Sequence, residues 1–301
     1  MGTGRSRVLK FIRERQDVQG TLLIMPTMFW LGIFLLIPLV LIVLISFAAR
    51  GQYGDVVYTF SLKNYRNLLD RQYVIILWDS TWIAFMTTAL SLVIGYPLAY
   101  FIARSHPRYR SFFLFMILVP FWTNFLIRIY AWMIMLRGQG VIGSVMTSLG
   151  LMRGLGEKIF NQIQLYTPGA VLIGMVYEFL PFMILPLYSS LEKLDPSLLE
   201  AAADLGARPW RAFLRVTLPL SLPGIVAGTI LVFVPAMGMF VVPDLMGGAR
   251  TVLVGNLIRN QYLVARDWPF GSAASMVLMI LTLAVTLVYT HFFGFGEELV
   301  A

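Results

Sequence analysis

Six long apolar stretches divide this chain, and they decide what it can fold into. They cover residues 22–48, 80–103, 111–136, 169–190, 217–242 and 273–293. A helix needs about 20 apolar residues to cross the hydrocarbon core of a bilayer. Only 13% of the residues are charged, against about 25% in an average soluble domain. The sequence therefore predicts an all-α membrane protein, with six transmembrane helices in a single domain over residues 22–293.

The basic residues between these stretches predict the orientation in the membrane. One side of the membrane has twelve Lys and Arg residues, which lie before the first stretch, in the short loop 104–110 and in the loop 191–216. The other side has ten, spread over three longer loops. Cytoplasmic loops carry the higher density of Lys and Arg. We therefore expect the N-terminal segment 1–21, the loop 191–216 and the tail 294–301 to be cytoplasmic. This topology explains the net charge of +8, which then gives no indication of nucleic-acid binding.

The segment EAAADLGARPWRAFLRVTLP, residues 200–219, is polar and helix-prone although it lies between two apolar stretches. Asp195 and Pro196 predict a helix start just before it, since Asp suits the N-cap and Pro the first helical position. Gly206 predicts the helix end, because glycine adopts the left-handed conformation common after a helix. A second short helix carrying Trp210 is expected next. Together the two helices would form a compact knob with a face of alanines.

The spacing within this segment resembles the EAA loop of permease subunits in binding-protein-dependent ABC importers. The family pattern is E-A-A, three residues, G, nine residues, I, one residue, L-P. Val216 stands at the isoleucine position, and the matching residues are Glu200, Ala201, Ala202, Gly206, Leu218 and Pro219. The resemblance implies a type I ABC importer permease fold in a bacterial inner membrane. It also implies that these six residues couple the subunit to a cytoplasmic ATPase dimer.

The chain carries no sequence pattern for using ATP itself. No phosphate-binding loop of the form G-x-x-x-x-G-K-[ST] occurs, and no G-x-S-x-G elbow or H-E-x-x-H helix. We therefore expect a non-catalytic subunit that binds no cofactor and no metal, with ATP and Mg²⁺ used by the partner ATPase. The expected mechanism is mechanical: the ATPase closes on ATP, the knob moves as a rigid body, and the attached helices tilt.

Four further stretches resemble the spermidine/putrescine branch of these permeases, and its first permease subunit in particular. They are residues 118–130, 180–207, 244–249 and 266–271. The resemblance is densest between about residues 110 and 272 and extends more loosely over nearly the whole chain. It implies a second, homologous permease subunit, a periplasmic polyamine-binding protein, and half of a translocation pathway for spermidine or putrescine.

Other functions stay open at this point. An ABC permease for another solute, such as iron(III), sulfate or an aminophosphonate, would share the same loop. An ion-coupled secondary transporter is the alternative from another class. Such transporters often contain inverted repeats, and residues 1–150 and 151–301 show no convincing repeat. An intramembrane enzyme would need paired catalytic groups, which the predicted helices lack.

Glu178 is a carboxylate inside a predicted transmembrane helix, where a charge costs about 2.5–3.5 kcal/mol on insertion scales. Pro181 and Pro186 follow it, and each frees a backbone carbonyl of the preceding turn. Carboxylates, carbonyls and aromatic rings suit an ammonium ion, so Glu178 and Tyr177 are candidates for the substrate pathway. Alternatively, Glu178 pairs with Arg128 or is protonated at a subunit interface. The branch that this chain resembles more often has an apolar residue at this position.

The remaining candidates lie toward the outer side. Trp122 is a candidate for stacking on the substrate, and Asp79 and Asp244 are candidates for a cation entrance. Arg128 is the wrong lining for a polyamine path, so we expect a structural or gating role for it and for Asn124, four residues earlier. The outer loops hold ten basic and six acidic residues, which is no electrostatic funnel for polyamines. We expect these loops to dock a binding protein that selects the substrate.

Overall fold

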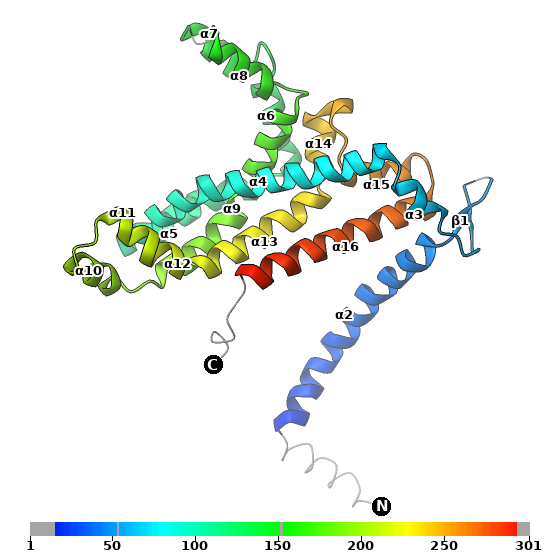
Figure 1. Cartoon of the computed structure of the whole chain (residues 1–301), viewed down its shortest axis with the longest axis horizontal. Helices are drawn as coiled ribbons and strands as arrows, with labels where there is room; N and C mark the ends of the chain where they lie inside the picture. Colours follow the sequence, from blue (N-terminus) through cyan, green and yellow to red (C-terminus); the bar gives the residue numbers. More distant parts are fainter. Residues whose placement is uncertain (1–15, 53, 151–152, 294–301) are drawn as a thin grey trace, which may run out of the picture.

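The computed structural model describes residues 16–52, 54–150 and 153–293, and these ranges are almost wholly helical (Figure 1). Four helices are long and apolar enough to cross a membrane: α2 (Gln16–Ser46), α4 (Arg71–Arg104), α9 (Pro168–Glu192) and α16 (Trp268–Phe293). Two bent helix pairs raise the number of candidate spans to six if each pair counts as one. The prediction of an all-helical membrane protein is confirmed. The predicted tail 294–301 and most of the segment 1–21 lie outside the described residues.

The predicted span 111–136 is wrong as a single helix. It consists of α5 (Pro107–Leu118), the 3-10 turn η1 (Val119–Trp122) and α6 (Phe125–Met135), and the axes before and after the break differ by 90°. Pro120 has no N–H to continue the α5 hydrogen-bond ladder. Beyond the turn, the Asn124 side chain accepts a 2.8 Å hydrogen bond from the N–H of Leu126 and caps a new helix. The two local signals therefore divide one apolar stretch.

The predicted span 217–242 is also interrupted. α11 (Pro209–Ala212), the π-helical turn η2 (Phe213–Thr217) and α12 (Leu218–Leu220) run into α13 (Leu222–Gly238) with a bend of 62° at Ser221. Pro223 lacks the N–H that would bond to the carbonyl of Pro219. α13 then ends at Gly238, earlier than predicted, and α4 begins at Arg71, nine residues before the predicted start at 80.

The core of the protein lies where α4, α9 and α13 pack against one another. Met175, Met183 and Leu187 of α9 are fully buried there. Gly228 of α13 faces Met183 so closely that an added Cβ would lie 2.7 Å from the Met183 sulfur. Small residues let transmembrane helices approach each other in this way. α16 packs on the outside of α13.

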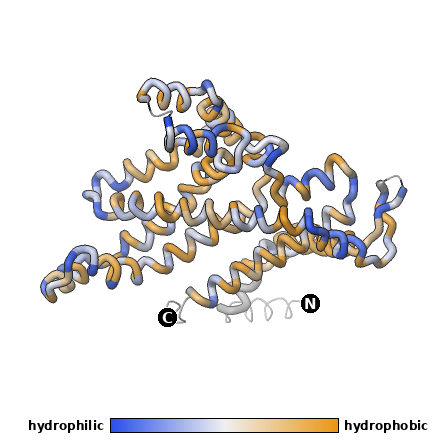
Figure 2. Tube along the Cα trace, turned by 45° about the horizontal axis from the view of Figure 1, so that its top comes forward, coloured by the Kyte–Doolittle hydropathy of each residue, from blue (hydrophilic) through white to orange (hydrophobic). Residues whose placement is uncertain are grey.

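The outer faces of the long helices are apolar. Figure 2 shows hydrophobic residues along all of them, with hydrophilic residues concentrated at the ends of the bundle and in the connections. The C-terminal end of α2, where Ser46 is buried, lies beside α16. The N-terminal end of α2 diverges from the bundle (Figure 1). Trp30 and Phe34 of α2 are both 63% exposed. Such a surface is stable in lipid and not in water.

The shorter elements lie at the ends and sides of the bundle. α10 (Ser197–Asp204) and α11 lie at one end, and α3 (Lys63–Leu68), α14 (Val241–Met246), η3 (Gly248–Arg250) and α15 (Val254–Leu263) lie toward the other (Figure 1). A small hairpin, β1 (Ala49–Arg50) with β2 (Val56–Val57), is antiparallel. α7 (Val141–Ser148) and α8 (Leu155–Ile163) project from the bundle beyond α6. The bundle thus separates the α10–α11 end from the α14–α15 end.

Candidate functional sites

α10 and α11 form the predicted knob. The N–H of Ser197 donates to the Asp195 carboxylate at 2.9 Å, which caps the start of α10 and holds the pKa of Asp195 below its ordinary value. At the other end, Gly206 has a φ of +76°. Its N–H and that of Ala207 donate to carbonyls of the last turn at 2.8 and 2.9 Å. This is the Schellman arrangement, and it confirms the predicted end of the helix at Gly206.

The surface of the knob is apolar with a basic rim. Leu205 is 89% exposed and Trp210 is 67% exposed. A groove of 300 Å³ runs between the two short helices, and it is lined by Ala202, Leu205, Gly206, Ala207, Arg211, Ala212, Arg215 and Val216. Exposed apolar surface of this kind is typical of a protein contact site.

The six residues of the EAA pattern do not form one cluster. Glu200 and Ala201 are exposed on α10, and Ala202 and Gly206 line the groove. The last two, Leu218 and Pro219, lie in α12, and Leu218 packs against the core. The structure therefore divides the pattern into a contact surface and a connection to the bundle.

Aromatic rings join the knob to the bundle through Phe213. Its ring stacks on Trp210, with centroids 5.6 Å apart, and meets the edges of Tyr96 and Tyr100 of α4 at 5.6 and 6.2 Å. The Tyr96 hydroxyl is hydrogen-bonded to Ser221 at 2.8 Å. These ring contacts and this hydrogen bond connect the knob to α4 and to the bend at Ser221.

Arg128 of α6 and Glu178 of α9 form a buried ion pair. The Nη2–Oε1 distance is 2.6 Å, and the side chains are 7% and 11% exposed. Nη1 of Arg128 also donates to the Pro120 carbonyl at 2.8 Å, and the guanidinium lies 4.6 Å from the centre of the Phe121 ring. Arg128 thus ties α9 to the broken segment between α5 and α6. The structure shows the ion pair, one of the alternatives for Glu178, and a role in the substrate pathway stays a prediction.

The aromatic candidates contact other rings. Tyr177 is half-buried and packs against Trp132 at 5.5 Å between centroids. Trp122 is 75% exposed and meets the edge of the Phe115 ring at 5.4 Å. The described residues give these two candidates separate ring partners, so a shared stacking site for the substrate stays a prediction.

The two carboxylates predicted to lie toward the outer side have different surroundings. Asp79 is exposed on α4 and has no ion-pair partner in the described part of the chain. Asp244 on α14 accepts a 2.6 Å hydrogen bond from Arg259 of α15. Sequence reasoning did not single out Arg259, because it lies fifteen positions along the chain across an irregular connection. Only the folded connection brings the two charges together.

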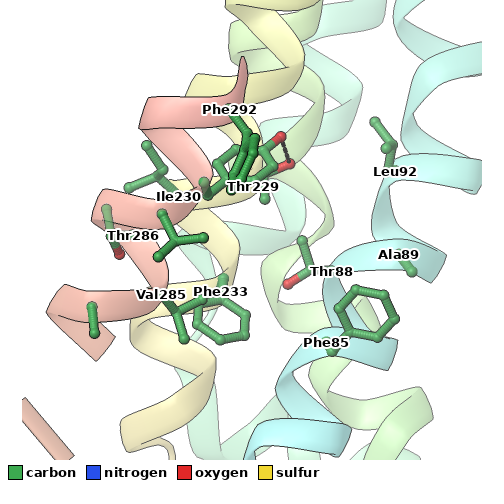
Figure 3. A pocket seen from close by; sticks show the side chains of 13 residues that line it. Phe85, Thr88, Ala89, Leu92, Thr229, Ile230, Phe233, Val285, Thr286 and Phe292 are labelled. Carbon is green, nitrogen blue, oxygen red and sulfur yellow. Dashed lines mark hydrogen bonds between the residues drawn. The ribbon is translucent and has the colours of Figure 1, made fainter. Parts of the chain in front are cut away.

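A cavity of 580 Å³ opens between α4, α13 and α16. Figure 3 shows Phe85, Phe233 and Phe292 around it. Tyr289 also lines the cavity, and its hydroxyl donates to Thr229 at 3.2 Å. None of the described residues that line it is charged. A polyamine carries several ammonium groups, and burying such a charge without a partner is unfavourable. We therefore do not assign this cavity to a polycationic substrate.

Comparisons with known proteins place these features in a family. Residues 91–293 match the family described as "Binding-protein-dependent transport system inner membrane component". The chain belongs to this family. The matched region contains the knob, Arg128 and Glu178, and it leaves out α2.

Named relatives of this inner-membrane permease cover most of its length. It is 45% identical over 260 residues to the spermidine/putrescine transport system permease protein PotB of Haemophilus influenzae, covering 86% of this chain and 89% of the relative. It is 47% identical over 261 residues to the protein of that name in Escherichia coli, covering 86% and 92%. Identity to the E. coli inner membrane ABC transporter permease protein YdcU is 32% over 305 residues, covering 98% and 96%.

Solved structures show the same permease fold. A bacterial ABC transporter involved in import of the acidic polysaccharide alginate aligns with a TM-score of 0.68 at 17% identity, covering 95% of this chain and 98% of that one. A bacterial alginate ABC transporter in complex with an alginate-bound periplasmic protein aligns with a TM-score of 0.64 at 19% identity, covering 95% and 96%. At these identities the likeness concerns the fold alone.

Proposed function

We propose that this permease forms half of the translocation pathway for spermidine or putrescine in an ATP-driven importer. The observation that carries the proposal is the 45–47% identity to spermidine/putrescine permeases over 86% of the chain. No specific observation favours iron(III), sulfate or an aminophosphonate, or an ion-coupled mechanism. The aligned region contains the knob, which an ion-coupled transporter does not need.

The proposed topology counts each bent helix pair as one span, which gives six. Residues 22–293 form a single permease domain, and its coupling loop 191–216 is cytoplasmic. Both termini of the chain are also cytoplasmic. The separation of α10 and α11 from α14 and α15 along the bundle supports opposite sides of the membrane for these two ends. The proposed partners are a second homologous permease, a cytoplasmic ATPase dimer and a periplasmic polyamine-binding protein. ATP and Mg²⁺ act in the ATPase, and this chain holds no cofactor.

The proposed mechanism begins at the knob. The ATPase holds the groove between α10 and α11, and closure of the ATPase on ATP displaces the knob as a rigid body. Phe213 passes this displacement to Tyr96 and Tyr100 of α4, and Ser221 passes it to α13. Since α4, α9 and α13 share one packed core, the pathway alternates between opening inward and opening outward.

The proposed function is tested by uptake in proteoliposomes. The complex is isolated from membranes with its partner subunits identified, reconstituted, and supplied with the polyamine-binding protein and labelled spermidine. We expect uptake that requires ATP, the ATPase and the binding protein. Uptake by the isolated permease would contradict the ATP-driven mechanism. Transport of sulfate or iron(III) in place of any polyamine would contradict the proposed substrate.

Glu178→Gln tests whether this carboxylate contacts the substrate. Glutamine keeps an oxygen that can accept from Arg128 and removes the charge. Because the Glu178 side chain is almost fully buried, with Oε1 accepting from Arg128 and Oε2 enclosed without a partner among the described residues, we expect an unchanged KM for spermidine. We expect a loss of about 1–3 kcal/mol in the free energy of unfolding. Uptake kinetics and unfolding in detergent measure the two quantities. A tenfold rise in KM at unchanged stability would instead place Glu178 in the substrate pathway.

A further inference from the structure

A polar pocket of 330 Å³ lies between α14, η3 and α15. It is lined by Asp244, Gly248, Thr251, Val252, Asn256 and Asn260, and we refer to it as the Asp244 pocket. The neighbouring elements place it at the end of the bundle opposite the knob (Figure 1). In the proposed topology this is the outer side, where a substrate leaves its binding protein.

Thr251 has an unused hydroxyl at this pocket. The residue is 8% exposed, and its Oγ1 atom is buried without a hydrogen-bond partner among the described residues. A buried hydroxyl without a partner costs free energy. Because Thr251 lines the pocket, a donor that reached this oxygen from the pocket would satisfy it and recover that free energy on binding.

Asp244 has one oxygen committed and one available. Its Oδ2 atom accepts from Arg259 at 2.6 Å, and its Oδ1 atom has Asn256 Nδ2 at 3.5 Å, a long contact. Asn256 is held in place by the protein itself: its Nδ2 donates to the Phe240 carbonyl at 2.9 Å and its Oδ1 accepts from the N–H of Leu253 at 3.3 Å. A carboxylate oxygen can accept about two hydrogen bonds, so Oδ1 of Asp244 can take a further donor.

Asn260 supplies a third oxygen. Its side chain is exposed, lines the pocket, and makes no hydrogen bond to another described residue. Three residues that line the pocket, Asp244, Thr251 and Asn260, therefore carry oxygens with capacity to accept a further hydrogen bond. A primary ammonium group has three N–H donors and no acceptor. The geometry points to a primary ammonium ligand, and we propose that the Asp244 pocket binds the terminal ammonium of a polyamine before it enters the pathway.

Arg259 sets how tightly the pocket holds this cation. It neutralises much of the Asp244 charge and also lies over the Phe240 ring, 5.8 Å from its centre. An ammonium bound at Asp244 Oδ1 therefore has a second cation close by, which weakens binding. A site that passes its ligand on needs binding that is favourable enough to enter and weak enough to leave. This inference rests on the proposed polyamine function.

Thr251→Val and Asp244→Asn in the reconstituted complex test the proposal. Valine keeps the shape of threonine and removes the hydroxyl, and asparagine removes the charge. We expect each variant to raise the KM for spermidine uptake by about tenfold, because each removes a hydrogen bond to a charged group, with little change in maximal rate. Matched controls are Thr147→Val on α7, whose hydroxyl already donates to Gly143, and Glu157→Gln on α8. These controls should keep the wild-type KM.

A second measurement uses the wild-type complex alone. Spermidine with a photoreactive group at one end keeps a free primary ammonium at the other, and we expect it to crosslink to the segment 240–260. If wild-type complex takes up spermidine but both variants keep the wild-type KM, or the crosslink maps elsewhere, the Asp244 pocket is not an ammonium site and the polyamine function stands. If the wild-type complex takes up no polyamine, the proposed function itself fails.

Discussion

Replacing Arg128 by methionine is expected to lower the free energy of unfolding by about 3–5 kcal/mol. In the wild-type protein both side chains of the ion pair are almost fully buried. The substitution therefore leaves the Glu178 carboxylate buried without its partner. It also frees the Pro120 carbonyl, so the 90° break between α5 and α6 loses its tie to α9. Denaturant titration in detergent, together with the yield of assembled complex, measures the loss.

The double variant Arg128→Met, Glu178→Leu separates the ion pair from general damage. Replacing a buried ion pair by apolar residues of similar volume is often neutral or stabilising. We therefore expect the double variant to recover most of the stability that the single variant loses. Arg137→Met, at an exposed position beyond the end of the same helix, is the matched control and should stay near the wild type. A single variant as stable as the wild type would show that the pair contributes little.

Replacing Gly206 by aspartate is expected to reduce ATP-driven uptake by about tenfold or more while the protein stays in the membrane. Gly206 lies in the left-handed region with φ +76°, and an added Cβ would meet no atom within 4 Å. The new side chain therefore does not disturb the core of this subunit. It places a negative charge at the mouth of the groove that the ATPase is proposed to hold. Uptake and ATP hydrolysis, measured together, should become uncoupled.

Two controls make this result specific to the knob. Gly150→Asp makes the same change at another left-handed glycine with open space around it, φ +69°, outside the knob, and should leave uptake unchanged. Gly206→Asn adds a side chain of nearly the same size without charge, and asparagine tolerates this conformation, so it should keep most of the coupling. Wild-type uptake by Gly206→Asp would show that the groove is not the coupling contact.

The spans were predictable because a bilayer imposes a length on every crossing helix. The predicted span 169–190 became α9, Pro168–Glu192, with Pro181 and Pro186 inside the helix. The same rule failed at 111–136, where Pro120 and Asn124 end one helix and start another. Average hydropathy does not distinguish a proline that a helix accommodates from one that breaks it. After Pro120, the Asn124 side chain caps a new helix, and Arg128 donates to the Pro120 carbonyl while it pairs with Glu178 of α9.

The candidate sites divide in the same way. The knob could be predicted because both caps of α10 are local. Asp195 accepts from the N–H of Ser197, two residues later, and the N–H of Gly206 donates to a carbonyl of the last helical turn. The sequence offered the Arg128–Glu178 pair only as one of several alternatives, because the residues lie fifty positions apart. Thr251 gave no signal at all, since a lone threonine near an apolar stretch is ordinary.

The amino-acid sequence by itself determined that lipid surrounds the long helices, the approximate positions of those helices, and the exposed knob that we propose for coupling. Each depends on residues within one or two turns of each other, or on the number of apolar residues in a row. Tertiary structure alone decided which charges pair and that Asp244, Thr251 and Asn260 line one pocket. Those features depend on how segments distant in the sequence pack together. The strength of a polar contact falls steeply with the distance between its atoms, and only the folded chain fixes that distance.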